Sequence, residues 1–206
     1  MTHIAVPSFQ ARPADPAPGP GIVVIHEGNG MSPQLLRFCE RLAHEGYATI
    51  APELFFRSGG PEAADFGTLI GAMDREQTQA DIAGAASVLR DAGATSIGIT
   101  GFCMGGMLSY RTAVTTPGFD AAVGFYGSGI PRQFGEPRCP TLLLFGGADE
   151  WIPMSEIEEV VARYPETVVY PEAGHGFMRD GSDSYHEASA TDAWKRLLAH
   201  FGEHLH

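Results

Sequence analysis

Three residue types that together can catalyse acyl transfer occur in a telling order along the chain. They are a thiol at Cys103, a carboxylate at Asp149 and an imidazole at His175. Thiolate is a nucleophile, an imidazole can relay its proton, and a carboxylate can fix the imidazole tautomer and stabilise the imidazolium. Each of the three follows a short apolar run that is typical of a buried strand. The order of nucleophile, acid and base therefore predicts a catalytic triad.

The thiol lies in the segment "GFCMGG" (residues 101–106), between an expected strand and an expected helix. A side chain at so tight a turn projects from the sheet edge into a cleft, and its neighbours must lack a Cβ, which explains the glycines. The free N–H groups and the positive end of the following helix favour thiolate at Cys103. We expect the backbone N–H of Met104 to receive a developing oxyanion, with a second donor from Gly28 after the first strand.

Each member of the triad has a plainer alternative when it is taken alone. Cys103 could be a small buried residue at a glycine-rich turn, Asp149 could cap a helix, and His175 could be a turn residue between two glycines. Together, each at its own strand end, they match the triad of the α/β-hydrolases. We therefore expect Cys103 as nucleophile, His175 as base and Asp149 as its partner.

The elements that position these residues alternate regularly between short strands and amphipathic helices. Strands are predicted at 22–26, 47–54, 96–100, 121–127, 141–147 and 167–174, and helices at 32–46, 73–93, 154–164 and 188–204, with a further helix after Cys103. Residues 11–21, rich in Pro and Gly, are expected to form an exposed loop. This alternation predicts a three-layer α/β/α sandwich with a mostly parallel sheet, in a single domain spanning residues 1–206. Functional groups in such sheets gather at the carboxyl ends of the strands.

The composition excludes several classes of function. The 206 residues are 44% hydrophobic and 18% charged, as in an ordinary soluble globular protein. A net charge of −12 without any basic block argues against nucleic-acid binding. No apolar run approaches the ~20 residues of a membrane-spanning helix. The N-terminal "MTHIAVPSFQARP" lacks the basic start and long apolar middle of a secretion signal.

The three cysteines, Cys39, Cys103 and Cys139, match neither a metal knuckle nor a disulfide framework. Free thiols indicate a reducing, cytoplasmic setting. The segment "HEGNG" (residues 26–30) lacks the second histidine of a zinc-protease helix and follows a strand, so we expect no metal there.

The sequence resembles the dienelactone hydrolase family, a branch of the α/β-hydrolases whose nucleophile is commonly cysteine. The resemblance runs from "IVVIHEGNG" to the last helix and is carried by "GFCMGG", "APELFFR", "GGAD" and "GHGFMR". It implies an α/β-hydrolase fold of minimal size, with the triad as assigned above. It also implies that Glu27 interacts with the thiol and helps it ionise when substrate arrives, and that Arg179 contacts a substrate carboxylate. From its position alone, Glu27 could equally cap a loop or be solvated at the rim.

Other positions carry weaker signals. The resemblance matches Arg57 to an arginine near the cleft mouth, but the following segment, up to residue 73, is short and has no counterpart to a second carboxylate-binding arginine. Tyr126 follows a strand and is expected to line the pocket, with packing beneath it as the alternative. Aromatic residues near strand ends would form an apolar cleft wall or pack in the core: Phe55, Phe56, Trp151 and Phe177.

The expected function is hydrolysis of a small ester or lactone through a cysteine acyl-enzyme, as in a carboxymethylenebutenolidase. No cofactor and no metal are implied, and the chain is expected to act as a monomer or small homo-oligomer. The alternatives are a thiol esterase with an unrelated substrate, a non-catalytic receptor for a small acid, and a redox sensor. The last would need a resolving thiol near Cys103.

Overall fold

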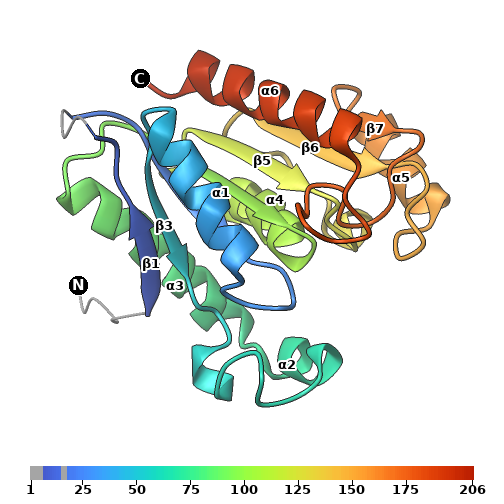
Figure 1. Cartoon of the computed structure of the whole chain (residues 1–206), viewed down its shortest axis with the longest axis horizontal. Helices are drawn as coiled ribbons and strands as arrows, with labels where there is room; N and C mark the ends of the chain where they lie inside the picture. The colour runs from blue at the N-terminus through green and yellow to red at the C-terminus, as the bar shows by residue number, and fades with distance from the viewer. Residues whose placement is uncertain (1–6, 15–17) are drawn as a thin grey trace.

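The computed structural model describes residues 7–14 and 18–206, so the start of the N-terminal segment used above to argue against secretion lies outside the described residues. One seven-stranded sheet forms the centre (Figure 1), with the strand order β1-β3-β2-β4-β5-β6-β7. The strands are β1 (Ser8–Ala11), β2 (Gly21–Ile25), β3 (Ala48–Pro52), β4 (Ile97–Phe102), β5 (Ala121–Phe125), β6 (Thr141–Gly146) and β7 (Val168–Tyr170). All neighbouring pairs are parallel except β1 with β3.

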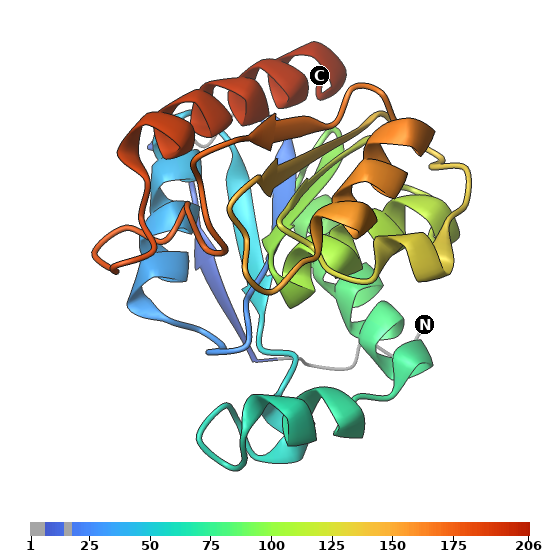
Figure 2. The same cartoon turned by 90° about the vertical axis from the view of Figure 1, so that its right-hand side faces the viewer.

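Helices cover both faces of this sheet. They are α1 (Pro33–His44), α2 (Phe66–Ala72), α3 (Arg75–Asp91), α4 (Met104–Thr115), α5 (Met154–Arg163) and α6 (Glu187–His204), with short 3₁₀ helices η1 (Phe56–Ser58) and η2 (Ile130–Gln133). Helices α1 and α6 lie on one face, and α3, α4 and α5 lie on the other (Figures 1 and 2). The predicted three-layer sandwich with a mostly parallel sheet is confirmed.

The core has two halves because successive strand side chains point to opposite faces. On β2, Ile22 and Val24 pack in the cluster that includes α1 and α6, whereas Val23 and Ile25 pack in the cluster with α3 and α4. All five residues of β2 are buried. Burial on both faces explains why the central strands read as continuous apolar runs rather than as alternating ones.

Strand β1, helix α2 and the two short 3₁₀ helices were not predicted from the sequence. The edge strand β1 has no buried residue, so no apolar pattern marks it. Of the expected loop at residues 11–21, Ala11 belongs to β1 and Gly21 to β2. Helix α2, capped by Asp65, lies with η1 beyond the end of β3, below the rest of the molecule in Figures 1 and 2. No helix in the described part of the chain has both the length and the apolar character needed to cross a membrane.

Candidate active site

Cys103 lies at a strained turn between β4, which ends at Phe102, and α4, which begins at Met104. Its backbone has φ 54° and ψ −117°, and its N–H donates to the carbonyl of Phe125 at 3.0 Å. Tyr126, directly after β5, is the other described non-glycine residue with positive φ. Such conformations cost free energy and are typical of functional sites. The turn presents the partly exposed thiol at the carboxyl end of the sheet.

The glycines around Cys103 let α4 approach the sheet closely. A Cβ on Gly101 would lie 2.5 Å from the carbonyl oxygen of Gly105, and one on Gly105 would lie 2.4 Å from that of Ile25. A Cβ on Gly106 would come within 2.2 Å of the Phe125 carbonyl. Because these neighbours are backbone atoms, a side chain could enter only if the helix moved. The prediction that the turn needs residues without a Cβ is therefore confirmed.

His175 and Asp149 form a hydrogen-bonded pair at the ends of β7 and β6. His175 Nδ1 lies 2.8 Å from Asp149 Oδ2, and the Asp149 side chain is fully buried. The other carboxylate oxygen accepts the N–H groups of Trp151 and Ile152, at 2.8 and 3.0 Å. These two amides hold the carboxylate in place, so that it fixes the imidazole with its proton on Nδ1. Asp149 thus holds the loop before α5 without capping that helix, whose N-cap is Pro153, and it also partners His175.

The electrostatics of His175 favour the imidazolium. Burial lowers the pKa of His175, but the Asp149 carboxylate and Cys103 together outweigh burial and raise the pKa to about 9. In the described part of the chain, the buried Nε2 has no partner at full hydrogen-bond geometry, although a looser hydrogen-bonding and a Coulombic interaction with Cys103 both contribute to the raised pKa. Catalytic hydrogen bonds are often long before substrate binds. Nε2 is therefore free to exchange a proton with sulfur or with a reacting group.

Glu27 and Arg179 form an ion pair in the same region. Glu27 is 4% exposed, and its Oε2 accepts from the Arg179 guanidinium. Burial lowers the pKa of Arg179, but the contact with Glu27 outweighs burial and raises it. Arg179 Nε is buried without a partner among the described residues. In this state Glu27 is thus neither solvated at the rim nor hydrogen-bonded to the thiol, and Arg179 keeps one donor unused.

These groups meet in one cavity of about 410 Å³. Its lining residues are Glu27, Gly28, Asn29, Phe66, Cys103, Trp151, His175, Arg179 and Ser184. Met104 is adjacent as the first residue of α4, where an amide has no acceptor within the helix. Of the aromatic residues expected to form a wall, only Trp151 lines the cavity. Sequence reasoning missed Asn29, Phe66 and Ser184, because none is the first polar residue after a strand.

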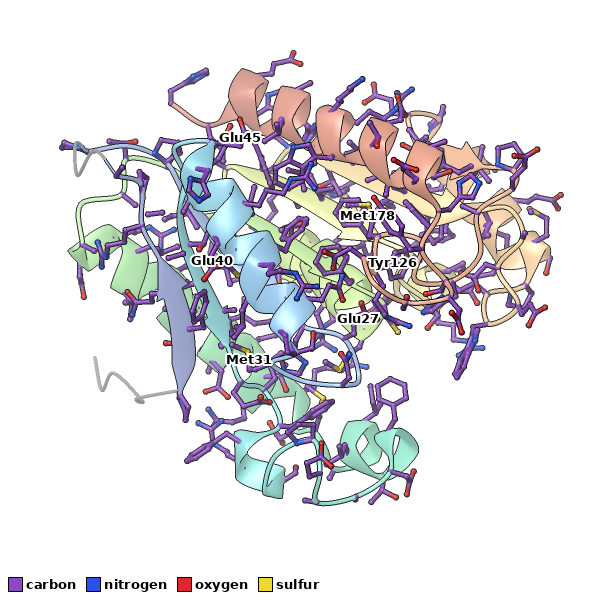
Figure 3. All side chains as sticks on the ribbon, in the orientation of Figure 1. Glu27, Met31, Glu40, Glu45, Tyr126 and Met178 are labelled. Carbon is purple, nitrogen blue, oxygen red and sulfur yellow. The ribbon has the colours of Figure 1, made fainter. Side chains whose placement is uncertain are left out.

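The structure does not bring Arg57 and Tyr126 to the cavity surface. Arg57 pairs with the carboxylate of Asp81 on α3. Tyr126 is fully buried, with its ring 5.0 Å from that of His175 and 5.3 Å from that of Phe177. It lies near Glu27 (Figure 3), which acts on it electrostatically. Burial raises the pKa of Tyr126 well above its usual value. The phenol of Tyr126 is therefore neutral, and its ring packs against the imidazole of His175.

The remaining cysteines are poor candidates for thiol chemistry. Burial raises the pKa of Cys39 to about 12 and that of Cys139 to about 11. Both are therefore thiols at neutral pH, whereas a resolving cysteine acts as a thiolate. Within residues 7–14 and 18–206, no three His, Cys, Asp or Glu side chains are grouped so that they could hold a metal ion.

Comparison with known proteins assigns the family. Residues 6–205 match the model of the dienelactone hydrolase family. A Salmonella typhimurium protein provisionally named carboxymethylenebutenolidase is 37% identical, over 97% of this chain and 83% of its own length. The crystal structure of a provisionally named dienelactone hydrolase from Klebsiella pneumoniae is 35% identical, with a TM-score of 0.87 over 97% of this chain and 93% of that one.

A more distant crystal structure shares the fold. It is the dienelactone hydrolase-like promiscuous phosphotriesterase P91 from metagenomic libraries, 21% identical with a TM-score of 0.74 over 92% of this chain and 88% of that one. The resemblance carried by "GFCMGG" and "GHGFMR" is confirmed at the level of the family and of its α/β-hydrolase fold. The chain belongs to the dienelactone hydrolase family and is a carboxylic-ester hydrolase of that type.

Proposed function

We propose that this chain hydrolyses a small ester or lactone through a thioester on Cys103. The observation that carries the proposal is the Asp149–His175 hydrogen bond of 2.8 Å, whose imidazole lines the same cavity as a thiol at a strained strand-to-helix turn. An imidazole oriented by a carboxylate beside a nucleophile is the arrangement that covalent acyl transfer needs. Family membership supports the same class of reaction.

Acylation transfers the acyl group from oxygen to sulfur. The Cys103 thiolate attacks the carbonyl carbon, a C–S bond forms, and the carbonyl electron pair moves onto oxygen. We assign the N–H groups of Met104 and Gly28 to that oxyanion. When the carbonyl re-forms, the C–O bond breaks and the imidazolium of His175 gives its proton to the departing alkoxide. A lactone opens in this step and remains attached as one molecule.

Deacylation returns the enzyme to its resting state. Water attacks the thioester while neutral His175 takes one of its protons, and the C–S bond breaks to release a carboxylic acid and Cys103. Acylation itself prepares the base, because a thioester carries no charge. The contribution of Cys103 to the raised His175 pKa is then lost, and the imidazole deprotonates more readily.

The cavity favours a small acyl group that carries a carboxylate. Arg179 is the only arginine or lysine among the cavity-lining residues of the described chain, and its Nε has no partner there. Phe66 and Trp151 offer apolar surface to the rest of the substrate. Water must clear a thioester in each cycle, so activated acyl groups such as enol lactones suit the site better than amides. The name carboxymethylenebutenolidase, given to the relatives, agrees with a lactone substrate.

Hydrolysis of p-nitrophenyl esters and unsaturated lactones by wild type and Cys103→Ala tests the proposal. We expect kcat/KM to fall at least about 10³-fold, because the oxyanion donors alone retain little catalysis. Cys139→Ala, which removes a buried thiol outside the cavity, is the matched control and should retain wild-type turnover. Turnover that survives loss of the Cys103 sulfur would contradict the mechanism. Binding of the lactones without product formation would favour a receptor instead.

A further inference from the structure

His26 is a fully buried residue with no part in the mechanism above. It follows β2 directly and precedes Glu27 and Gly28, yet it does not line the cavity. Its ring makes two contacts with backbone. Nδ1 lies 2.6 Å from the carbonyl oxygen of Glu27, and Nε2 accepts the N–H of Leu54 at 3.0 Å. His26 therefore connects the loop after β2 to the segment after β3.

These two contacts fix the tautomer of the ring. A backbone N–H can only donate, so Nε2 must carry a lone pair, and the proton of the neutral ring lies on Nδ1. Nδ1–H then donates to the Glu27 carbonyl. The acidic groups facing the ring are Glu53, with Oε1 3.4 Å from Nε2, and Glu27 itself. Burial nevertheless lowers the pKa of His26, so the ring is neutral at neutral pH.

The hydrogen bond from His26 also sets the direction of the next amide. The Glu27 carbonyl accepts from His26 Nδ1 and from the N–H of Gly30, the latter at 3.1 Å. The described peptide bonds are all trans. In a trans peptide the C=O and the N–H point in opposite directions, so the Gly28 N–H points away from His26. Gly28 lines the active-site cavity, and no acceptor for its amide occurs among the described residues.

This peptide needs an external constraint. Glycine at position 28 lowers the barrier to alternative backbone conformations, and Gly30 two residues later has φ 67°. If the peptide rotated by half a turn, the Glu27 carbonyl would replace the N–H at the cavity. A carbonyl dipole there would repel the oxyanion that forms during acyl transfer.

We propose that His26 is a positioning residue for the oxyanion hole: its Nδ1–H holds the Glu27–Gly28 peptide with the Gly28 N–H directed at the oxyanion. The inference rests on the proposed function, since it requires acyl transfer at Cys103. The two oxyanion donors come from two different segments. Met104 supplies a donor from the start of α4, and His26 keeps the second donor in place from the end of β2.

Two isosteric substitutions separate the contacts of His26. The amide of Asn reaches the position of Nδ1, so His26→Asn retains a donor to the Glu27 carbonyl and loses the acceptor for Leu54. The amide of Gln reaches the position of Nε2, so His26→Gln has the opposite effect. We expect kcat for p-nitrophenyl acetate to fall at least about ten-fold in His26→Gln, short of the roughly 10²–10³-fold cost of deleting an oxyanion donor. In His26→Asn it should fall less, with KM little changed in either variant.

Alkylation of Cys103 by iodoacetamide is the control measurement, because displacement of iodide by sulfur forms no oxyanion. His26→Gln should be alkylated at the wild-type rate while its esterase kcat is reduced. An equal loss of both rates would assign His26 a merely structural role and overturn the proposal, as would an unchanged kcat. Activity that persists in Cys103→Ala would instead refute the proposed function, so the two failures are distinguishable.

A measurement on the wild-type protein tests separately the premise that the Gly28 N–H is directed at the oxyanion. A trifluoromethyl ketone adds to a catalytic thiolate and leaves an oxyanion in the hole. With ¹⁵N-glycine labelling, the Gly28 amide proton should move downfield when this adduct forms, as a new hydrogen bond requires. A Gly28 amide that does not shift while the adduct forms would overturn the proposal.

Discussion

At the residue scale, the site depends on an imidazole that interacts with both Asp149 and Cys103. Asp149 holds Nδ1 of His175 through a hydrogen bond, and Cys103 acts on the same ring from the other side. Both interactions raise the pKa of His175 and so favour the imidazolium. Acylation of Cys103 removes one of the two.

The titration of His175 tests this pairing. With its pKa raised to about 9 in the folded enzyme, the ring should stay protonated through neutral pH and lose its proton as pH rises through about 9. The acylation rate should decline over the same range. In Cys103→Ala the contribution of Cys103 is absent, so the His175 pKa should fall, whereas in Cys139→Ala it should not change. NMR of ¹⁵N-histidine-labelled protein reports both pKa values, and equal His175 pKa values in wild type and Cys103→Ala would contradict a contribution of Cys103.

Arg179 should discriminate between substrates by charge. In Arg179→Gln the guanidinium is lost, so KM for an ester that carries a carboxylate should rise about ten-fold or more, as expected for a charge-assisted hydrogen bond. KM for the matching neutral ester should change much less. Because Glu27 is buried and loses its partner, unfolding must be measured alongside. An equal change in KM for both esters would show that Arg179 does not bind a substrate carboxylate.

At the element scale, the close approach of α4 to the sheet holds the nucleophile in place. Gly105→Ala would place a Cβ 2.4 Å from the Ile25 carbonyl oxygen, so the unfolding free energy should fall by about 1–3 kcal/mol or more, and activity should fall with it. Gly84→Ala in α3 is the matched control, because nothing lies within 4 Å of its Cβ. That change should stabilise the protein by roughly 0.5–1 kcal/mol. Urea unfolding compares the two, and equal effects would contradict the packing argument.

The segment after β3 is held by a partly buried ion pair. Asp81 on α3 is 3% exposed and accepts from both Arg57 and Gln77. Arg57→Ala would remove the cation that offsets the cost of burying the Asp81 carboxylate. The free energy of unfolding should therefore fall by about 1–3 kcal/mol. KM should stay unchanged because Arg57 does not line the cavity. A raised KM with an unchanged free energy of unfolding would instead show that Arg57 takes part in substrate binding.

The elements that the sequence predicts well are those buried on one or two faces. The apolar runs of β2 and β4 are local signals, and the structure bears them out. Strand β1 escapes prediction because it is held by pairing with β3, which local pattern does not reveal. Helix α2 has a single buried residue, Leu69, and so shows no apolar stripe.

At the scale of the whole molecule, the sheet edge gathers residues that are far apart in the chain. The grouping of Cys103, Asp149 and His175 could be expected because each lies at or shortly after the carboxyl end of a strand, and parallel strands present these ends together. Phe66 and Ser184 could not be predicted as cavity residues. Each lies in a long connection between a strand and the next long helix, and the path of such a connection depends on tertiary packing. The positions of Arg57 and Tyr126 likewise depend on partners, Asp81 and His175, that sequence spacing does not identify.

The central claim is that one sulfur atom carries the acyl group. A slowly hydrolysed enol lactone, quenched in acid during turnover and followed by peptide mass spectrometry, tests it most directly. We expect the mass of the opened lactone on the peptide that contains Cys103, its disappearance as substrate is exhausted, and no adduct on Cys103→Ala. Continued hydrolysis with an unmodified Cys103, or an adduct that forms on another residue, would contradict the account.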